Sequence, residues 1–371
     1  MEKKLHVLIL YQFQEHENLL LLLKEKVKLH NIEISLFNTR TFKFSENPQN
    51  YWFLQFLVKL PKIRVFVYNY FRTKIVLSLS SKYDIIDIHY FSTIYDFLFE
   101  KLNHPKVKIS FWGSDAYRIT DERKKKLNTI TAPSKCIRFN TIEMYTKMEK
   151  YFDKKEILGH QIFGNSFFEL INVSNKNKTE AKKKVAIPSE KISVFVGYNA
   201  SKGQQHELIL NQLKDLPVEL KNQIILVLPL TYGADRKTKE TIRALALSTG
   251  IETKCFVDTL NQEEISFLRL SSDIVINFQI SDAFSASLQE HFYTNSIMIL
   301  GAWLPYDWLS KEGLFFYSIH PNELFDLLSR IIQDIDIEKV KFNSNNVTIS
   351  SISSWESVSR LWADDYRQML N

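Results

Sequence analysis

Two carboxylates with a fixed offset, Asp282 and Glu290, stand out in the last third of the chain. Two short apolar runs flank them, Asp273–Phe278 before and Ile297–Leu300 after, and each is typical of a buried strand. The pair is therefore expected on a strand–loop–helix turn. In α/β proteins, ligands bind in the crevice at the carboxyl ends of such strands.

The segment between the two carboxylates contains a run of small residues. The run is Phe284-Ser285-Ala286-Ser287, and it lets the backbone approach a ligand closely. Its amides would open the helix that carries Glu290, and a helix N-terminus attracts anions. The arrangement predicts a site for a phosphorylated polyol, with amides for the phosphate and Glu290 for hydroxyls. A pair of solvated helix charges is the alternative.

Composition limits the classes of protein that the chain can belong to. Its 371 residues, 45% of them hydrophobic, indicate two domains with packed cores. No GxGxxG or GxxxxGK[ST] pattern occurs, which argues against the usual dinucleotide fingerprint and against a P-loop. The start of the chain reads as a first strand, not as a signal peptide, and no apolar run approaches the roughly 20 residues of a membrane span. The two cysteines, Cys136 and Cys255, fit a reducing cytoplasm and offer no metal or disulfide framework.

Strand-like and helix-like segments alternate along both halves of the chain, which predicts an α/β fold with parallel sheets. We expect an N-terminal Rossmann-like domain over residues 1–171 and a second one over 185–350, with a cleft between them. The polar stretch 172–184 is interpreted as a linker. A final helix within 351–371 can return to the N-terminal domain.

Several of these segments resemble bacterial GT-B glycosyltransferases. The second domain begins with VGYNASKGQQHELIL, a turn Pro229-Leu230-Thr231-Tyr232-Gly233 follows a strand, and the carboxylate pair has the offset of a Glu-x7-Glu element. The pattern is similar to the enterobacterial common antigen Fuc4NAc transferase family and to the wider Glu-x7-Glu, family 4-like transferases. The resemblance covers about residues 80–345. It implies a GT-B fold, with two Rossmann-like domains whose parallel sheets face a central cleft, and a metal-independent hexosyltransferase.

The resemblance also implies roles for the residues at these positions. Glu290 would bind the ribose hydroxyls of a nucleotide, and Asp282 would approach the donor sugar. The chain departs from the family in two places: Asp282 stands where the family has Glu, and the arginine of the first loop of the second domain is absent. Asn199 stands near that place, and Lys202 remains.

The other expected donor contacts come from loops of the second domain. Lys202, nearby backbone amides and the helix start with Phe284, Ser285 and Ser287 would stabilise the charge that develops on the leaving phosphate, without a metal or other cofactor. His206, which opens the next helix, is a further candidate for the phosphate. Tyr232 and Gly233 could hold the base or the phosphate. For these residues an exposed lysine, a surface histidine and a purely structural turn remain as alternatives. The late Asp334-Ile335-Asp336 is interpreted as surface charge, not as a metal site.

Two residues of the first domain are candidates for catalysis. Asp115, in the turn Trp112-Gly113-Ser114-Asp115, could serve as a general base for an acceptor hydroxyl or as a helix N-cap. His89 ends a strand and could lie near the acceptor, although a satisfied core histidine is the common alternative.

The N-terminal half is basic. Residues 1–170 carry 27 Lys+Arg against 18 Asp+Glu, and residues 47–83 have six basic residues, nine aromatic residues and no acidic one. Basic and aromatic side chains together are typical of a helix that lies on an anionic leaflet. A core helix with a solvated edge is the alternative, and no RNA-binding motif supports contact with nucleic acid.

Three functions are therefore open. The first is transfer of a sugar from a nucleotide diphosphate-sugar to a glycan, lipid-linked acceptor in bacterial surface polysaccharide synthesis. Such an enzyme is expected in the cytoplasm, peripherally attached to the inner face of the membrane. The others are a GT-B sugar-nucleotide epimerase and a non-catalytic GT-B partner subunit.

Overall fold

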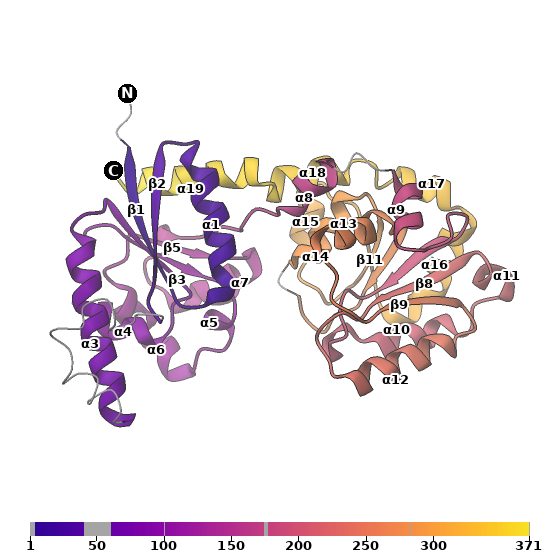
Figure 1. Cartoon of the computed structure of the whole chain (residues 1–371), viewed down its shortest axis with the longest axis horizontal. Helices are drawn as coiled ribbons and strands as arrows, with labels where there is room; N and C mark the ends of the chain where they lie inside the picture. The colour runs from indigo at the N-terminus through magenta and orange to yellow at the C-terminus, as the bar shows by residue number, and fades with distance from the viewer. Residues whose placement is uncertain (1–3, 41–60, 100, 174–176, 283, 371) are drawn as a thin grey trace. The chain divides into compact units, whose positions relative to one another are not determined.

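The computed structural model describes residues 4–40, 61–99, 101–173, 177–282 and 284–370. The chain divides into two compact units, Met1–Gly164 with Trp355–Asn371, and Asn165–Ser354. Each unit contains one six-stranded parallel sheet with helices around it (Figure 1). The expected α/β class with two parallel sheets is confirmed.

The sheet of the first unit has the strand order β2-β1-β3-β4-β5-β6. Its central strands are buried along their whole length, as parallel strands covered on both faces usually are. The strands are β1 (Leu5–Tyr11), β2 (Ile32–Asn38), β3 (Ile85–His89), β4 (Val107–Phe111), β5 (Cys136–Phe139) and β6 (Leu158–His160).

Two hydrophobic clusters cover the two faces of this sheet. One packs α1 and α19 on the face that carries Val7 and Ile9 of β1, and the other packs the remaining helices on the face that carries Leu8 and Leu10. Short 3₁₀ turns lie at 93–95, 149–151 and 155–157. The helices are α1 (Gln14–Lys28), α3 (Pro61–Ser80), α4 (Asp96–Phe99), α5 (Ser114–Tyr117), α6 (Asp121–Thr131), α7 (Ile142–Met148) and α19 (Trp355–Gln368).

The sheet of the second unit has the order β12-β11-β10-β7-β8-β9, so the direction of winding reverses between β7 and β10. This is the strand order of a doubly wound nucleotide-binding sheet, read from either edge. The strands are β7 (Ile192–Val196), β8 (Ile224–Pro229), β9 (Glu252–Phe256), β10 (Ile274–Asn277), β11 (Ile297–Gly301) and β12 (Tyr317–Ile319).

The helices of the second unit lie around this sheet (Figure 1). Side-chain caps set several of their starts: Asn261 forms a reciprocal capping box with Glu264, and Asp235 caps α12. Short 3₁₀ turns lie at 202–204 and 321–323. The helices are α8 (Phe167–Val173), α9 (Lys178–Lys184), α10 (His206–Leu213), α11 (Val218–Lys221), α12 (Arg236–Leu247), α13 (Gln262–Leu270), α14 (Ala286–Tyr293), α15 (Asp307–Lys311), α16 (Leu324–Gln333), α17 (Ile335–Val340) and α18 (Asn345–Ser353).

The unit boundaries differ from the ranges expected from the sequence. The second unit already begins at Asn165, and most of the expected linker, 172–184, is occupied by helix α9. Asn177 caps this helix and Ala181 is fully buried, so a lysine-rich and apolar-poor stretch still packs on the unit. At the other end of the chain, α19 contributes Trp355 and Trp362 to the hydrophobic core of the first unit.

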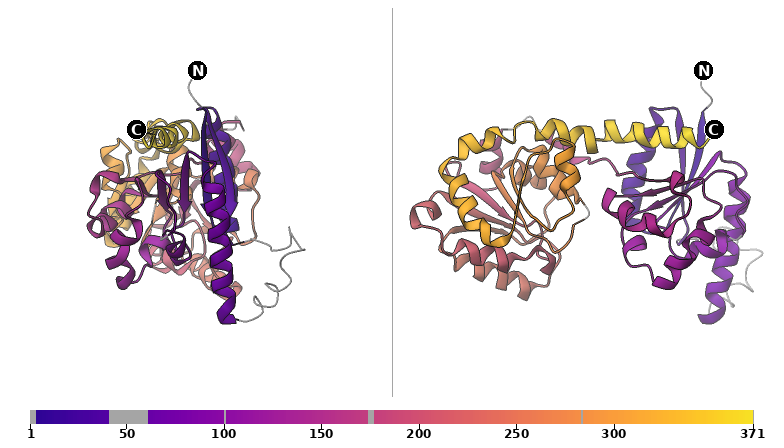
Figure 2. Two further views of the ribbon diagram at one scale, coloured as in Figure 1. Left: turned by 90° about the vertical axis from the view of Figure 1, so that its left-hand side faces the viewer. Right: turned by 180° about the vertical axis from the view of Figure 1, so that it is seen from behind.

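Helix α3 carries part of the stretch that was expected to face a membrane. Residues 47–60 lie outside the described residues. In the described part, Val76 belongs to the hydrophobic core, and Arg72 is buried with its Nε donating to the Thr39 carbonyl at 2.6 Å. Figure 2 shows α3 as a long helix beside the sheet of its unit. Arg72 therefore holds this helix to the unit, as the core-helix alternative requires. None of the helices in the described ranges combines the length and apolarity of a membrane span.

Candidate functional site

Most of the expected site residues lie near the place where the strand order of the second sheet reverses, between β7 and β10. We call this place the reversal point. The loop after β7 runs from Gly197 to Gln205, and the loop after β10 leads from Phe278 into α14. Both leave the carboxyl ends of neighbouring strands, where ligands bind in doubly wound sheets. This position follows from strand order alone, before any side chain is considered.

Side chains of the loop after β7 determine the conformation of that loop. Gly197 has a φ of +64°, and a Cβ there would lie 2.7 Å from Oε1 of Gln204. Gln204 Oε1 accepts the backbone N–H of Tyr198, and Asn199 Oδ1 accepts that of Ser201 at 2.8 Å. The side-chain oxygen of Asn199 therefore stabilises the turn. A ligand would contact this loop chiefly through its backbone and through neighbouring side chains.

The turn after β8 is fastened to this loop. The Ala200 N–H donates to the Tyr232 carbonyl at 2.7 Å. Gly233 has a φ of +94°, and a Cβ at that position would lie 2.8 Å from the Ser201 nitrogen. Gly233 is therefore required for close approach of the two segments, while Tyr232 remains 59% exposed.

A cavity of about 130 Å³ opens beside Tyr232. Aromatic and apolar groups form most of its wall, with one charged group, Arg269. The lining comes from the loops after β7, β8 and β9 and from one face of α13, including Tyr198, Thr231, Thr259, Leu260 and Ile265. A small and mainly apolar cavity with aromatic side chains and a few polar groups is suited to a planar ring.

Lys202 and His206 border a second cavity, of about 850 Å³, between α10 and α12. Lys202 is exposed, whereas His206 is 4% exposed and burial lowers the pKa of its imidazole to about 4. His206 is therefore neutral at physiological pH. It can donate or accept a hydrogen bond to a phosphate, but it brings no positive charge.

Several buried polar atoms around the reversal point have no hydrogen-bond partner among the described residues. Native proteins satisfy nearly all such atoms, so a cluster of exceptions calls for an explanation such as a ligand. The atoms are Gln204 Nε2, His206 Nε2, Asn277 Nδ2, Ser287 Oγ and Arg269 Nη1.

Asp282 is half-buried and holds the start of the loop after β10. Its Oδ2 accepts hydrogen bonds from the Tyr306 hydroxyl at 2.5 Å and the Ser285 hydroxyl at 3.1 Å. Burial raises the pKa of the Tyr306 phenol well above its ordinary value, and the charge of Asp282 adds to this effect. The Asp282 carboxylate is thus the acceptor in both hydrogen bonds, and the Ser285 hydroxyl donates to it from the position just before α14.

Phe284 plays a structural part through its side chain. The ring is 5% exposed and packs edge-to-face on Trp308 with centroids 5.1 Å apart, while the backbone takes a φ of +57°. A left-handed phenylalanine is sterically costly and is found chiefly where surrounding packing imposes it. Any contact of Phe284 with a ligand would therefore come from the backbone of this turn.

Glu290 lies deeper than the sequence suggested. It is 3% exposed, and Oε2 accepts from Nε of Arg269 at 2.8 Å. Burial raises the pKa of the Glu290 carboxyl, while the Arg269 charge and the Asn165 amide oppose the rise. No local pattern in the sequence indicates Arg269, because its pairing with Glu290 joins residues of two different helices, α13 and α14.

In the first unit, Asp115 connects two loops at the carboxyl edge of the sheet through hydrogen bonds. Its carboxylate accepts the backbone N–H groups of Phe91 at 2.9 Å, Trp112 at 3.0 Å and Gly113 at 2.8 Å. Burial raises its pKa to about 6, although these three hydrogen bonds act in the opposite direction. Asp115 also borders a cavity of about 520 Å³ together with Ser92, Arg118 and Arg123. Its position fits both a structural clasp and a base for an acceptor.

His89 is a core residue. Its side chain is wholly buried, Nδ1 accepts from Trp112 Nε1 at 3.1 Å, and Nε2 lies 3.2 Å from Oδ2 of Asp87. Both ring nitrogens face protein groups. The structure therefore favours the core alternative over contact of His89 with an acceptor.

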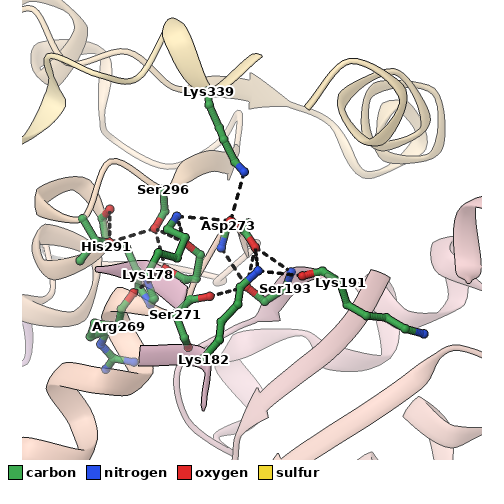
Figure 3. A network of polar contacts seen from close by, with 12 residues as sticks. Lys178, Lys182, Lys191, Ser193, Arg269, Ser271, Asp273, His291, Ser296 and Lys339 are labelled. Carbon is green, nitrogen blue, oxygen red and sulfur yellow. Dashed lines mark hydrogen bonds and ion pairs between the residues drawn. The ribbon is translucent and has the colours of Figure 1, made fainter. Parts of the chain in front are cut away.

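A second polar network lies at the amino end of β10, and Figure 3 draws it together with Arg269 and His291. Asp273 pairs with Lys182 at 2.6 Å, Lys178 at 3.4 Å and Lys339 at 3.5 Å. These lysines come from α9 and α17, so the network connects both helices to the start of the strand. Asp334 and Asp336 are exposed at the start of α17.

No protein-family model matches the sequence, and no curated protein matches it. Solved structures do. The chain is similar to a glycosyltransferase from Rickettsia africae, with 14% identity and a TM-score of 0.72, over 100% of this chain and 99% of that chain. It is also similar to Anabaena HepE in complex with UDP (12% identity, TM-score 0.70, 98% and 100% covered) and to sucrose-phosphate synthase from Thermosynechococcus elongatus (13%, 0.68, 99% and 99%).

These similarities show that the chain has the same α/β architecture as glycosyltransferases of the GT-B class. The GT-B part of the resemblance drawn from the sequence is thus supported at the level of fold. The Fuc4NAc transferase family is not among these structural neighbours, so that finer assignment stays a prediction.

Proposed function

We propose that the chain transfers a sugar from a nucleotide diphosphate-sugar to a glycan acceptor. The observation that carries the proposal is the 130 Å³ cavity at the carboxyl ends of β7, β8 and β9, whose wall includes Arg269 with a buried nitrogen that has no partner among the described residues. The cavity suits the nucleobase, and the loop after β7 with the start of α14 suits the diphosphate. HepE, which shares the fold, has been solved with UDP and with UDP-glucose.

In this proposal the diphosphate is neutralised without a metal. Lys202 supplies a flexible positive charge, and His206 and Gln204 supply buried donors close to Gly197. The start of α14, which has no acidic residue in its first turn, adds the positive end of a helix dipole. Such fixed donors stabilise the charge that grows on the leaving phosphate in the transition state.

The acceptor side is proposed for the first unit. Asp115 at the 520 Å³ cavity is the candidate base, and Arg118 and Arg123 offer donors for sugar hydroxyls or an acidic group. The excess of basic residues over 1–170 agrees with a lipid-linked acceptor at an anionic membrane surface, as in bacterial surface polysaccharide synthesis. A peripheral site at the inner face of the membrane is part of the same proposal.

The first test is a thermal-melt screen of the purified chain with UDP-, GDP- and dTDP-sugars. A ligand at a hundredfold excess over its Kd stabilises the folded state by about 2.7 kcal/mol, so the correct donor raises the melting temperature. Tyr232→Ala should weaken that donor by about 1–3 kcal/mol if the ring stacks on the base. Val218→Ala, an exposed position on α11, is the matched control.

Hydrolysis or transfer of the bound donor then decides between the functions. Release of nucleoside diphosphate with transfer of the sugar supports the proposal, whereas an altered sugar still attached to its nucleotide identifies an epimerase. If none of the nucleotide-sugars shifts the melting temperature, the proposal is wrong and the result favours a non-catalytic partner subunit.

A further inference from the structure

The second unit buries a guanidinium group whose hydrogen bonds are only partly satisfied. Arg269 lies in the last turn of α13, is 8% exposed, and is paired through Nε with Glu290 at 2.8 Å. A guanidinium has five N–H donors in a rigid plane, and burying such a charge is unfavourable unless it is paired and hydrogen-bonded. Glu290 satisfies one side of this group and fixes the plane of the fork.

The Nη1 end of the guanidinium is left unpaired by the part of the chain that the structure describes. Nη1 of Arg269 is buried and has no hydrogen-bond partner among the described residues, although Arg269 borders the 130 Å³ cavity. Ile265 and Leu268 border the same cavity. They lie four residues and one residue before Arg269 on α13, so one face of the helix presents two apolar side chains and this guanidinium. A buried donor left without an acceptor is costly, so its retention beside a cavity points to an acceptor that arrives with a ligand.

Arg269 is the charged group in the wall of its cavity, and the expected phosphate donors border the other one. Burial, with the charges of Arg269 and Lys178, holds the pKa of neighbouring His291 well below its ordinary value, so that ring adds no second cation. Lys202 and His206 border the other cavity, of about 850 Å³. The cavity at Arg269 has Tyr198, Tyr232 and Leu260 in its wall, which suits a flat ring better than a phosphate.

We propose that Arg269 binds the nucleoside half of the sugar donor, donating through Nη1 to an oxygen of the base or ribose, and that Glu290 positions it. This inference rests on the proposed function, because it concerns the donor cavity. It changes the role expected for Glu290 from the sequence: the carboxylate acts through Arg269 and does not itself accept the ribose hydroxyls.

The experiment compares a nucleoside diphosphate with its free nucleoside by calorimetric titration of the full chain. The probes are UDP and uridine, GDP and guanosine, and dTDP and thymidine, and the pair that binds the wild-type chain is used. Arg269→Met keeps most of the side-chain volume and removes the donors, and Arg269→Lys keeps the charge without the fork. Arg243→Met, at an exposed arginine on α12, is the control.

Arg269→Met should weaken the nucleoside and the nucleoside diphosphate by the same factor, roughly tenfold or more, since a hydrogen bond from a charged group is lost in both. Arg269→Lys should recover little of this loss. A loss for the diphosphate with no loss for the nucleoside would place Arg269 at the phosphates and overturn the inference. Unchanged affinities with a lower melting temperature would show a purely structural arginine and overturn it as well.

A double-mutant cycle separates positioning by Glu290 from direct contact. If Glu290 acts only through Arg269, then the pair Arg269→Met with Glu290→Leu binds no more weakly than Arg269→Met alone. If Glu290 binds ribose hydroxyls itself, the two losses add, and the positioning role is wrong. Should Arg269→Met fail to fold, the same cycle with Arg269→Lys and Glu290→Gln gives the answer. Failure of the wild-type chain to bind any of the six probes would instead defeat the proposed function, and this inference with it.

Discussion

At the scale of single residues, the candidate donor site is defined by polar atoms that the fold buries without satisfying. Gln204 Nε2 and His206 Nε2 lie close to Gly197 at the end of β7, and Arg269 Nη1 belongs to a residue of α13 that borders the 130 Å³ cavity. A core optimised for stability alone would pair or remove such groups, because each unsatisfied donor costs about 1–3 kcal/mol. These unsatisfied donors of the second unit therefore argue for recognition of a ligand more strongly than the identity of any one of them.

The position of Asp115 predicts how kcat/KM depends on pH. If its carboxylate removes a proton from the acceptor, kcat/KM should rise as pH rises through about 6, where burial places the pKa of this carboxyl. Asp115→Asn should lower the rate by a factor of roughly 10²–10⁴ and abolish that limb of the profile. Asp121→Asn, at an exposed carboxylate on α6, is the control.

The same shift affects the stability of the first unit. The folded state keeps the Asp115 proton up to about pH 6, while the unfolded chain loses it near pH 4. The free energy of unfolding should therefore fall as pH rises between these values, by this group's contribution, and stay level above them.

A flat pH–rate profile between pH 5 and 7, in a chain that folds normally, would rule out Asp115 as the base.

The sequence could indicate the turn at 282–290, because a small-residue run between two apolar runs is a local pattern. It could not indicate that Glu290 is buried against Arg269, because that contact depends on how α13 and α14 pack. Likewise Lys108 stands in the middle of strand β4 and looks exposed from its type alone. It is fully buried there, because Asp365 and Gln161 receive its ammonium group.

At the scale of elements, charged contacts hold helices to strand ends. Asp273, just before β10, receives Lys178 and Lys182 from α9 and Lys339 from α17, and its Oδ2 also accepts the Ser193 N–H at the start of β7 (Figure 3). Burial raises the pKa of Asp273, but the three lysine charges outweigh it and hold this pKa well below its ordinary value. A single carboxylate thus organises four elements.

Asp273→Asn should destabilise the second unit by about 3–5 kcal/mol, because the buried Lys182 loses the charge that compensates it. In the wild-type chain the contribution of Asp273 should be complete above about pH 4 and be lost as pH falls toward its depressed pKa. Urea unfolding at pH 7 and at pH 3 measures both effects. Asp334→Asn, at an exposed aspartate, should change neither value, and a loss equal to this control would refute the structural role.

The elements themselves were predictable to different degrees. Short runs of β-branched and other apolar residues predict the buried strands. The sequence predicts a strand over Val107–Phe111 and helices over His206–Leu213 and Gln262–Leu270, and β4, α10 and α13 have these bounds. Helix α9 was read as a linker because its sequence is nearly all polar, and only packing of Ala181 and pairing of its lysines explain it. The three-residue β12 gave no pattern, since it is too short to show a period.

At the scale of the whole molecule, one unit is continuous in sequence and the other is not. The second unit uses the unbroken stretch Asn165–Ser354, whereas the first needs Trp355–Asn371 from the other end of the chain. Helix α19 brings buried Trp355, Trp362 and Tyr366 into the core beside α1. Its Asp365 also receives Arg138 through two hydrogen bonds, of 2.6 and 2.7 Å.

Trp362→Ala should therefore weaken the first unit alone. The expected cost is about 3–5 kcal/mol, from the loss of a fully buried ring and of its hydrogen bond to the Ile162 carbonyl. Hydrogen exchange should show faster exchange of amides in β1–β6 and unchanged exchange in β7–β12. The neighbouring Leu361→Ala, at an exposed position on the same helix, is the control and should have little effect.

An equal acceleration of exchange in both sheets would show that the two units unfold together and would contradict this prediction. Acceleration in β7–β12 alone would contradict the assignment of α19 to the first unit.

The discontinuous first unit has a consequence for synthesis of the protein. Residues 355–371 leave the ribosome only after residues 165–354, so the nascent first unit waits with the face of its sheet beside α1 incompletely covered. Domains usually complete folding in the order of their synthesis. Here the later unit can close its core first, and the earlier one depends on α19, which leaves it open to proteases and to chaperone binding until that helix has been synthesised.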